Sequence, residues 1–204
     1  MGRVRAYIGI GSNVGDAPRT VTAAVHALAA LPDGRLVAVS RLYATTPVGV
    51  TDQAEFRNAV VALDVPAGPD PATGALSLLV ALKELERASG RRRRRRWGPR
   101  ELDLDLLVFG RATIAVERPP AGSSIDAPPG VSALVVPHPD AHERLFVLAP
   151  LADLAPGLVP PGWRETVATA RRRQLAIEGT DAVRPIARWD LDAERWSGAE
   201  EADG

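Results

Sequence analysis

Hydrophobic and polar positions in the first 110 residues alternate in blocks that predict six secondary-structure elements. Strand-like patterns cover residues 5–11, 35–43, 56–65 and 102–109. Apolar residues at helical spacing predict one helix that starts at Asp16 and another that runs from Leu76 to about Gly90. A Pro/Gly cluster at 66–71 breaks the chain before the second helix. The order strand, helix, strand, strand, helix, strand is typical of a ferredoxin-like α+β sandwich, with helices packed on a mainly antiparallel sheet.

The second half of the chain has a less regular pattern. Residues 117–132 are rich in Pro, Gly and Ser and predict an extended surface loop. A short strand is expected at 134–138 and a helix at 141–151. The last forty or so residues are charged and weakly patterned, although three tryptophans there suggest docking onto the body (Trp163, Trp189 and Trp196). We therefore expect one domain over residues 1–160 and a C-terminal extension over 161–204, with the final GAEEADG disordered.

Composition and charge narrow the classes of protein that this chain can belong to. The 204 residues fit one domain of ordinary size, and a hydrophobic fraction of 46% supports a real core. Lys+Arg and Asp+Glu both number 25, which argues against a dedicated nucleic-acid binder. The absence of cysteine excludes disulfides, thiolate metal sites and cysteine nucleophiles. With no apolar signal segment or membrane-length run, we expect a cytoplasmic monomer that binds neither membranes nor nucleic acids.

The segment LDLDL at 102–106 places two acidic residues in a strongly predicted strand. Side chains alternate along a strand, so Asp103 and Asp105 share one face while the three leucines face the core. At a rise of about 3.3 Å per residue, the two Cα atoms would lie about 6.6 Å apart. Two carboxylates that close repel each other unless a cation lies nearby, and the spacing suits Mg²⁺ ions that also bind phosphate oxygens. The alternative is an exposed edge strand with ordinary acidic residues.

The glycine-rich segment GIGSNVG does not have the spacing of a dinucleotide-binding fingerprint. Its glycines stand at positions 9, 11 and 15, whereas the fingerprint requires the third at 14. The simpler interpretation is a turn whose backbone needs glycine. The chain also lacks the GxxxxGK pattern of a P-loop. If phosphates bind here, arginines and metal ions must hold them.

Arginines cluster immediately before the two aspartates. The run of six at 91–96 is most simply a solvated, flexible segment. Arg100 differs, because it follows Trp-Gly-Pro and lies three residues before Asp103, where its guanidinium can bind a phosphate through two hydrogen bonds. His138 and Arg144, in VPHPDAHERLF, form a second candidate pair for anion binding.

These motifs together resemble the 6-hydroxymethyl-7,8-dihydropterin pyrophosphokinase family of folate biosynthesis. The resemblance rests on YIGIGSNVGD, TTPVGVTDQAEFRNAVVAL, RWGPRELDLDLLVFG and VPHPDAHERLFVLAPL, which occur in the family's order over about residues 5–160. It implies that residues 1–160 form the pyrophosphokinase domain, with the ferredoxin-like fold. It also implies transfer of the β,γ-diphosphate of ATP to the hydroxymethyl group of a reduced pterin, with release of AMP. Two Mg²⁺ ions would bridge the two substrates.

The same resemblance assigns roles to individual residues. Catalytic roles fall on Arg91, Arg100, Asp103 and Asp105, of which the two aspartates would bind the metal. ATP binding falls on Glu86, Arg91, Arg96, Arg100, Leu106, His138 and Arg144. Pterin binding falls on Asn13, Thr45, Pro47, Val48, Phe56, Asn58, Trp97 and Phe146. In that set Trp97 and Phe146 would sandwich the pterin ring, and Asn13 would lie behind the pocket. No strong general base is evident near the substrate hydroxyl, so activation of that hydroxyl by the metal or by Asp105 is favoured.

Three departures from the family pattern and two alternative functions stay open. The run 91–96 is all arginine where the family mixes charges, the segment 117–132 is longer than usual, and the tail beyond about residue 160 is extended. One alternative is a different metal-dependent phosphotransferase or nucleotidyltransferase on the same fold, which the reaction products would distinguish. The other is an RNA-binding module that uses the arginine run, whose affinity would fall steeply with salt.

Overall fold

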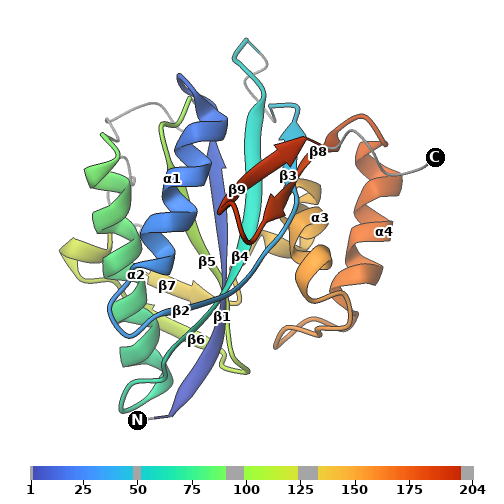
Figure 1. Ribbon diagram of the computed structural model, residues 1–204. Coiled ribbons are helices and arrows are strands. Elements are labelled where there is room, and N and C mark those ends of the chain that lie inside the picture. The colour runs from blue at the N-terminus through green and yellow to red at the C-terminus, as the bar shows by residue number, and fades with distance from the viewer. Residues whose placement is uncertain (1, 48–51, 91–98, 124–132, 199–204) are drawn as a thin grey trace.

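The computed structural model describes residues 2–47, 52–90, 99–123 and 133–198 (Figure 1). The strands are β1 (Arg3–Ser12), β2 (Arg35–Val39), β3 (Leu42–Thr45), β4 (Phe56–Pro66), β5 (Asp103–Phe109), β6 (Ile114–Glu117), β7 (Ala133–Val136), β8 (Val183–Asp190) and β9 (Arg195–Gly198). The helices are α1 (Ala17–Ala29), α2 (Pro71–Ala88), α3 (Leu145–Leu154) and α4 (Val167–Glu178). Short 3₁₀ turns occur at Pro120–Gly122 and Ala141–Glu143. None of the helices in these ranges has the length and apolar character that a membrane span requires.

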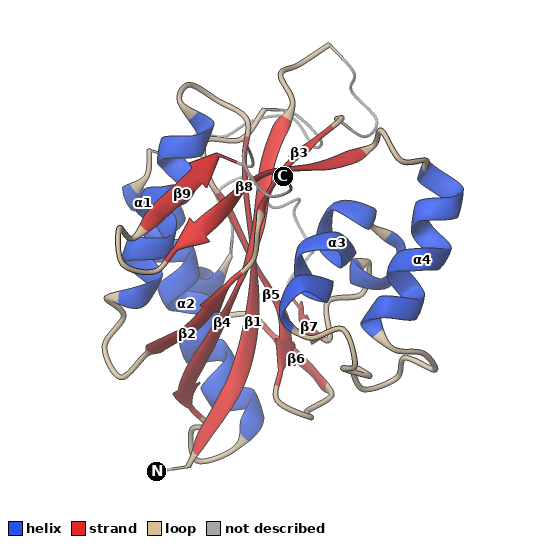
Figure 2. Ribbon diagram, turned by 45° about the vertical axis from the view of Figure 1, so that its right-hand side comes forward, coloured by secondary structure: helices blue, strands red, loops and turns tan. Residues whose placement is uncertain are grey.

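The predicted ferredoxin-like α+β sandwich is confirmed. Within the described ranges a seven-stranded sheet has the order β5-β1-β4-β3-β8-β9, with β2 also paired to β4. All pairings between its strands are antiparallel. Helices α1 and α2 cover one face of the sheet, and α3 and α4 lie on the other (Figure 2). The central order β5-β1-β4-β3 is the one that the split βαβ pattern predicts.

The strand predicted over 35–43 is in fact two strands, β2 and β3. Ser40 lies at the break, where its backbone N–H donates to the carbonyl oxygen of Val60 and its Oγ accepts from the Val60 N–H, both at 2.9 Å. The Ser40 hydroxyl therefore takes the place of a backbone carbonyl. The next residue, Arg41, directs its N–H and guanidinium to Asp153 instead of to β4. Polar side chains thus end one strand and start the next, which alternation in the sequence does not reveal.

Helix α2 begins earlier than the apolar pattern predicts. Asp70 caps it, because its Oδ1 accepts from the Thr73 backbone N–H at 3.0 Å and Pro71 occupies the first turn. The cluster 66–71 was interpreted only as a chain breaker, whereas its last two residues are a helix start signal. Helix α1 starts as predicted, with Asp16 accepting from the Arg19 N–H at 3.1 Å.

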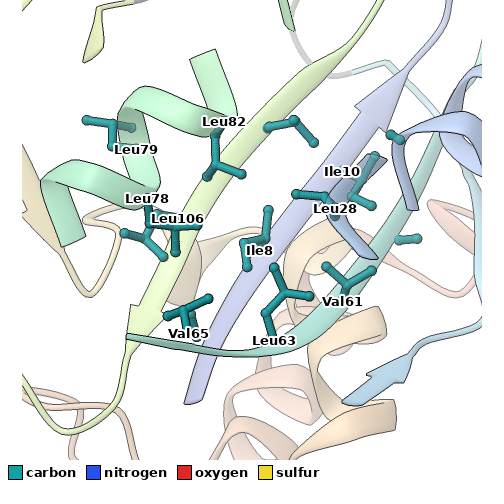
Figure 3. Packing of buried hydrophobic residues seen from close by; sticks show 14 of the residues in the cluster. Ile8, Ile10, Leu28, Val61, Leu63, Val65, Leu78, Leu79, Leu82 and Leu106 are labelled. Atoms are coloured by element: carbon teal, nitrogen blue, oxygen red, sulfur yellow. The ribbon is translucent and has the colours of Figure 1, made fainter. Parts of the chain in front are cut away.

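The larger part of the hydrophobic core lies between the sheet and helices α1 and α2 (Figure 3). Strand β1 alternates, so that Ala6, Ile8 and Ile10 are buried in this core. The intervening residues face α3 and α4, where Tyr7 packs against a second cluster that includes Val60, Leu107 and Leu148. The polar positions of the central strands therefore open toward the face that carries α3 and α4.

The C-terminal residues are more regular than their sequence pattern indicates. They form α4 and a β8–β9 hairpin, and β8 extends the main sheet by pairing with β3. The expected docking of the tryptophans is confirmed, since Trp189 and Trp196 contact each other edge to face at 4.6 Å and pack on the main core. Trp163 packs on the second cluster. The domain boundary near residue 160 stays a prediction, and the final stretch GAEEADG lies, after Gly198, outside the described residues.

The long segment 117–132 connects β6 and β7, which form a separate two-stranded sheet. Its first part makes a 3₁₀ turn that Arg87 holds by donating to the carbonyl oxygen of Ala121 at 3.1 Å. Residues 124–132 lie outside the described part of the chain. The strand predicted at 134–138 corresponds to β7, and the helix predicted at 141–151 corresponds to a 3₁₀ turn followed by α3.

Asp64 joins three strands and gives stability a defined pH dependence. Its carboxylate accepts from Arg5 and from Arg35, each at 2.6 Å, and these hydrogen bonds lower its pKa from 3.8 to about 2. Because the folded-state pKa is depressed, the stabilisation is present above pH 3.8 and is lost as the pH falls toward 2.

We expect Asp64→Asn to lower the urea midpoint of unfolding at neutral pH, with a difference from wild type that shrinks between pH 3.8 and about 2. The exposed Asp181→Asn is the matched control and should leave the midpoint unchanged. A difference between wild type and Asp64→Asn that does not depend on pH would show that packing, not charge, is responsible.

Candidate active site

One cavity of about 110 Å³ is lined by most of the described residues that the sequence predicted as site residues. We call it the site cavity, and its walls are Gly11, Thr45, Thr46, Phe56, Asn58, Arg100, Asp103, Asp105, Arg144 and Phe146. These residues come from β1, β3, β4, β5 and the start of α3, or lie within three residues of those elements. Of the ten, Gly11 and Thr46 were not predicted. The cavity lies on the sheet face that carries α3 and α4, since Arg144 and Phe146 at the start of α3 form part of its wall.

Two glycines of β1 form the floor between the aspartates and Asn58. Gly11 is paired with Asp103 on one side and with Asn58 on the other, and Gly9 is paired with Asp105 and Val60. A Cβ atom on Gly11 would lie 2.9 Å from the Oδ1 of Asn58. The strand predicted over 5–11 includes both glycines and is confirmed, whereas the interpretation of GIGSNVG as a turn does not hold for residues 9 and 11. Two glycines two positions apart share one face of a strand and indicate close approach from that side.

The strand that carries the aspartates has the predicted alternation. Leu102, Leu104 and Leu106 are at most 3% exposed, whereas Asp103 and Asp105 are partly exposed and line the site cavity. Asp103 forms an ion pair with Arg100, with 2.8 Å between its Oδ2 and the guanidinium Nη1.

The residues present fit Mg²⁺. Within the described ranges, no group of three or more His, Cys, Asp or Glu side chains is arranged to hold a metal ion. Two carboxylates on one face of the site cavity nevertheless match Mg²⁺ sites that use one or two carboxylates and take the remaining ligands from water and substrate phosphates. Asp103 and Asp105 would hold the ions.

The opposite wall of the cavity combines a buried amide with two aromatic rings. Asn58 is 7% exposed, and its Nδ2 donates to the Oγ1 of Thr45 at 2.7 Å. Phe56 and Phe146 line the same space, and the Arg144 guanidinium carbon lies 5.9 Å from the centre of the Phe146 ring. A fixed amide and aromatic rings in one cavity suit a flat heteroaromatic ligand with donors and acceptors along its edge. Pro47 is buried two residues after β3.

Asn13 connects two segments of the site, the one that carries Arg100 and the one that leads into Phe56. Its Oδ1 accepts from the Arg100 N–H at 2.7 Å, and its backbone N–H donates to the Arg100 carbonyl oxygen at 3.0 Å. On the other side its Nδ2 donates to Gln53 at 3.1 Å and to the carbonyl oxygen of Ala54 at 3.0 Å. Asn13 therefore fixes Arg100 relative to the chain that leads into Phe56. Gln53 was not predicted, and no pattern around it gave a signal.

Three residues assigned to ATP do not line the site cavity. Glu86 is 1% exposed, and its carboxylate binds Lys83 on the same helix. Leu106 points into the main core beside Leu78, so any contact with ATP would have to use its backbone (Figure 3). His138 lines a neighbouring groove of about 290 Å³ together with Trp163. Their ATP contacts stay predictions. Four other assigned residues lie outside the described part of the chain, namely Val48, Arg91, Arg96 and Trp97.

The chain is similar in sequence and in fold to proteins with known names. The family model described as 7,8-dihydro-6-hydroxymethylpterin-pyrophosphokinase (HPPK) matches residues 7–156. Two 2-amino-4-hydroxy-6-hydroxymethyldihydropteridine pyrophosphokinases are similar to the chain. The one from Methylorubrum extorquens is 44% identical over 174 residues, covering 85% of this chain and 97% of its own length. The one from Pseudomonas aeruginosa is 43% identical over 160 residues, covering 78% and 86%.

The fold also matches solved structures. A Plasmodium falciparum HPPK-DHPS triple mutant has a TM-score of 0.71 at 15% identity, covering 98% of this chain. This chain spans about half of that protein, 49% of its length, and at such low identity the likeness concerns the fold alone. The site geometry, the family model and the two bacterial relatives agree. The chain belongs to the 7,8-dihydro-6-hydroxymethylpterin-pyrophosphokinase family.

Proposed function

We propose that the site cavity is where this pyrophosphokinase joins its two substrates. As a member of its family, the chain transfers diphosphate to 6-hydroxymethyl-7,8-dihydropterin in folate biosynthesis, with ATP as the co-substrate. The observation that carries the proposal is a single cavity with two chemically different walls. One wall holds a buried amide and aromatic rings, and the other holds Asp103, Asp105 and Arg100.

The wall with Asn58 would bind the pterin. A pterin is a flat ring system whose edge carries both hydrogen-bond donors and acceptors, and an amide side chain can pair with either kind of group. The hydrogen bond to Thr45 fixes the Asn58 amide before the ligand arrives, which limits the entropy lost on binding. Phe56 and Phe146 would contact the ring faces.

The wall with the aspartates would bind the triphosphate of ATP. Arg100 and Arg144 both line the cavity and can donate charged hydrogen bonds to phosphate oxygens. Two bound Mg²⁺ ions would neutralise phosphate charge and help to orient the transferred group. The Asp103 carboxylate pairs with Arg100 at 2.8 Å, so an acidic and a basic group that serve the same phosphate chain already lie together.

Position and charge would carry most of the catalysis. The hydroxymethyl oxygen of the pterin forms a bond to the β-phosphorus of ATP. The bond from that phosphorus to the oxygen bridging the α-phosphate breaks, and AMP leaves with that oxygen. The proton of the attacking hydroxyl would pass to the Asp105 carboxylate or to solvent water. Negative charge is dispersed over the transferred group in such transition states, so fixed cationic groups around the cavity stabilise it.

The products test the proposal directly. The purified chain with ATP, Mg²⁺ and 6-hydroxymethyl-7,8-dihydropterin should form AMP and the pterin diphosphate in equal amounts. Formation of ADP with a pterin monophosphate would identify a different phosphotransferase. Binding of RNA that falls steeply with salt, without product, would instead favour the RNA-binding alternative.

Arg100→Ala should lower kcat/KM for ATP at least about tenfold. The side chain is preorganised between the Asn13 contact to its backbone and the Asp103 ion pair. A charged hydrogen bond is worth roughly 1.5–3 kcal/mol, and about 1.4 kcal/mol corresponds to one decade in rate.

The matched control replaces Arg93 and Arg94 together by alanine, under the same salt and Mg²⁺. Neighbouring arginines remain in that run, and if the run is solvated as the sequence predicts, its charges are screened, so the loss should be modest. If the double variant is the more damaged of the two, the run is a specific phosphate clamp and the roles must be exchanged.

A further inference from the structure

Strand β5, which carries both aspartates, is an edge strand of the main sheet. It pairs with β1 and stands first in the strand order. In an antiparallel pair, every second residue of an edge strand directs its N–H and C=O away from the partner strand. Leu104, between Asp103 and Asp105, is fully buried, so its two backbone groups need partners other than water.

Two side chains of α2 supply these partners. The Leu104 N–H donates to the Oε1 of Glu86 at 2.7 Å, and the Nζ of Lys83 donates to the Leu104 carbonyl oxygen at 2.7 Å. Lys83 also donates to the same Glu86 oxygen at 2.6 Å, which closes a ring of three contacts. We call Lys83 and Glu86 the edge clamp. Together they provide one acceptor and one donor, as a residue of a neighbouring strand would.

The edge clamp is deeply buried, which argues that it positions the backbone of β5 and adds little net stability. The side chains of Lys83 and Glu86 are 3% and 1% exposed. An ion pair at such depth contributes little net stability, because removing both charges from water offsets most of their attraction. Lys83 is also the single lysine of the chain, and all the other long cationic side chains are arginines. A compact ammonium can reach two acceptors in this space, whereas the planar fork of arginine has a different shape.

The position of the clamp connects it to the reaction. Asp103 and Asp105 flank Leu104 and point toward the site cavity on the other face of the strand. Their partners on β1 are Gly11 and Gly9, which have no side chains to support them from that strand. The backbone between the aspartates is therefore held from the edge side, by α2.

We propose that Lys83 and Glu86 are positioning residues that set the spacing of Asp103 and Asp105 without touching either substrate. This inference rests on the proposed role of the two aspartates in Mg²⁺ and ATP binding. It assigns Glu86 a structural task in the site in place of the direct ATP contact that the family resemblance implies. Loss of the clamp would let β5 shift. The two carboxylates would then no longer be spaced to bind the Mg²⁺ ions.

The test uses Lys83→Met, Glu86→Gln and the double variant Lys83→Met/Glu86→Met. The double variant replaces the ion pair by apolar side chains of similar volume, an exchange that often leaves stability unchanged. Glu86→Gln is the conservative variant, since its carbonyl oxygen can still accept from Leu104. The matched control is Glu84→Gln, the same substitution at an exposed position of the same helix.

Three measurements separate positioning from folding. Binding of Mn²⁺, followed by electron paramagnetic resonance with a non-hydrolysable ATP analogue, should weaken about 10- to 100-fold in Lys83→Met and in the double variant, the usual effect of removing a supporting partner. The fluorescence-detected affinity for the pterin alone should change less than about twofold, because Asn58 and Thr45 lie on other strands. The Leu104 amide should exchange faster with solvent deuterium.

The outcomes distinguish this inference from the proposed function. Wild-type Mn²⁺ affinity in Lys83→Met and in the double variant, or pterin affinity that falls in parallel with thermal stability, would overturn the positioning role. Wild-type protein that forms no AMP and pterin diphosphate would overturn the proposed function, whatever the clamp variants do. A Glu86→Gln variant that binds Mn²⁺ better than Lys83→Met, with Glu84→Gln unchanged, is the pattern that the edge clamp predicts.

Discussion

Asp103→Asn and Asp105→Asn should each remove nearly all activity while the protein stays folded. Each substitution keeps the shape of the side chain and removes one negative charge from the wall of the site cavity. We expect kcat/KM to fall more than about 100-fold, beyond the roughly 10- to 100-fold typical of residues that only support a metal ligand. Steady-state kinetics at graded Mg²⁺ concentrations, with ATP and the pterin varied in turn, measure this loss.

Stability should respond much less than activity to these two substitutions. Both side chains are partly exposed, and the Asp103–Arg100 pair, at 24% and 26% side-chain exposure, contributes little to folding. Removing one of two neighbouring carboxylates also relieves their repulsion. Thermal unfolding should therefore stay near that of wild type, and the exposed Asp181→Asn should change neither property. Near-normal turnover of either variant at ordinary Mg²⁺ concentrations would rule out the two-metal interpretation.

Cutting the chain after residue 165 should destroy the native fold. The sequence pattern predicted a C-terminal extension over 161–204 beside a domain that ends at residue 160, and a peripheral extension could be removed without loss of activity. The structure leads to the opposite expectation, because the removed part contains α4, β8 and β9 and forms one edge of the main sheet. Val167 and Ala170 are fully buried against α3, and Val183 packs beside Tyr43 and Leu145.

The energetic reason is the area that truncation would expose. Burying one large aliphatic side chain is worth roughly 1.5–3 kcal/mol, and a typical domain has a net stability of about 5–15 kcal/mol. Truncation exposes buried residues on both sides of the cut as well as the backbone of β3. It also removes Glu178, whose carboxylate accepts from the Leu145 N–H at 3.0 Å at the start of α3, between Arg144 and Phe146.

Circular dichroism and urea unfolding of the 1–165 protein test this expectation. The matched control ends at residue 198 and keeps β9 whole, so it should fold and retain activity. A cooperatively folded and active 1–165 protein would show that the sheet does not need β8. A folded but inactive one would place the C-terminal segment among the supports of the site.

Several features of this protein are determined by short-range sequence patterns. The alternation of LDLDL gives two aspartates on one face and buried leucines on the other, since strand geometry depends only on neighbours. Asp16 followed by Ala17 and Pro18 starts a helix for equally local reasons. The order of the first six predicted elements was enough for the ferredoxin-like fold, and the motifs in sequence were enough for the family.

Other features depend on which segments the tertiary structure brings together. The start of α2 was missed although its signals are local, because Asp70-Pro71 lies in a cluster of breakers. The break at Ser40 depends on its hydrogen bond with Val60. The pairing of β8 with β3 joins residues far apart in the chain. Local periodicity predicts neither contact. Weak patterning of the tail reflects a hairpin that buries only one side against the body.

The site shows the same division. Residue types near 45, 58, 103 and 146 were recognised from motifs, but their meeting in one cavity depends on the order β5-β1-β4-β3 and on α3 crossing that face. The spacing of Gly9 and Gly11 indicates a close approach, but the residues beside them follow only from strand pairing. The contact of Lys83 and Glu86 with Leu104 cannot be inferred from local periodicity, because it joins a helix to the edge of a strand. Alternation and capping act over a few residues, whereas pairing of strands and burial of charge act between distant segments, and these long-range contacts decided how the site is held.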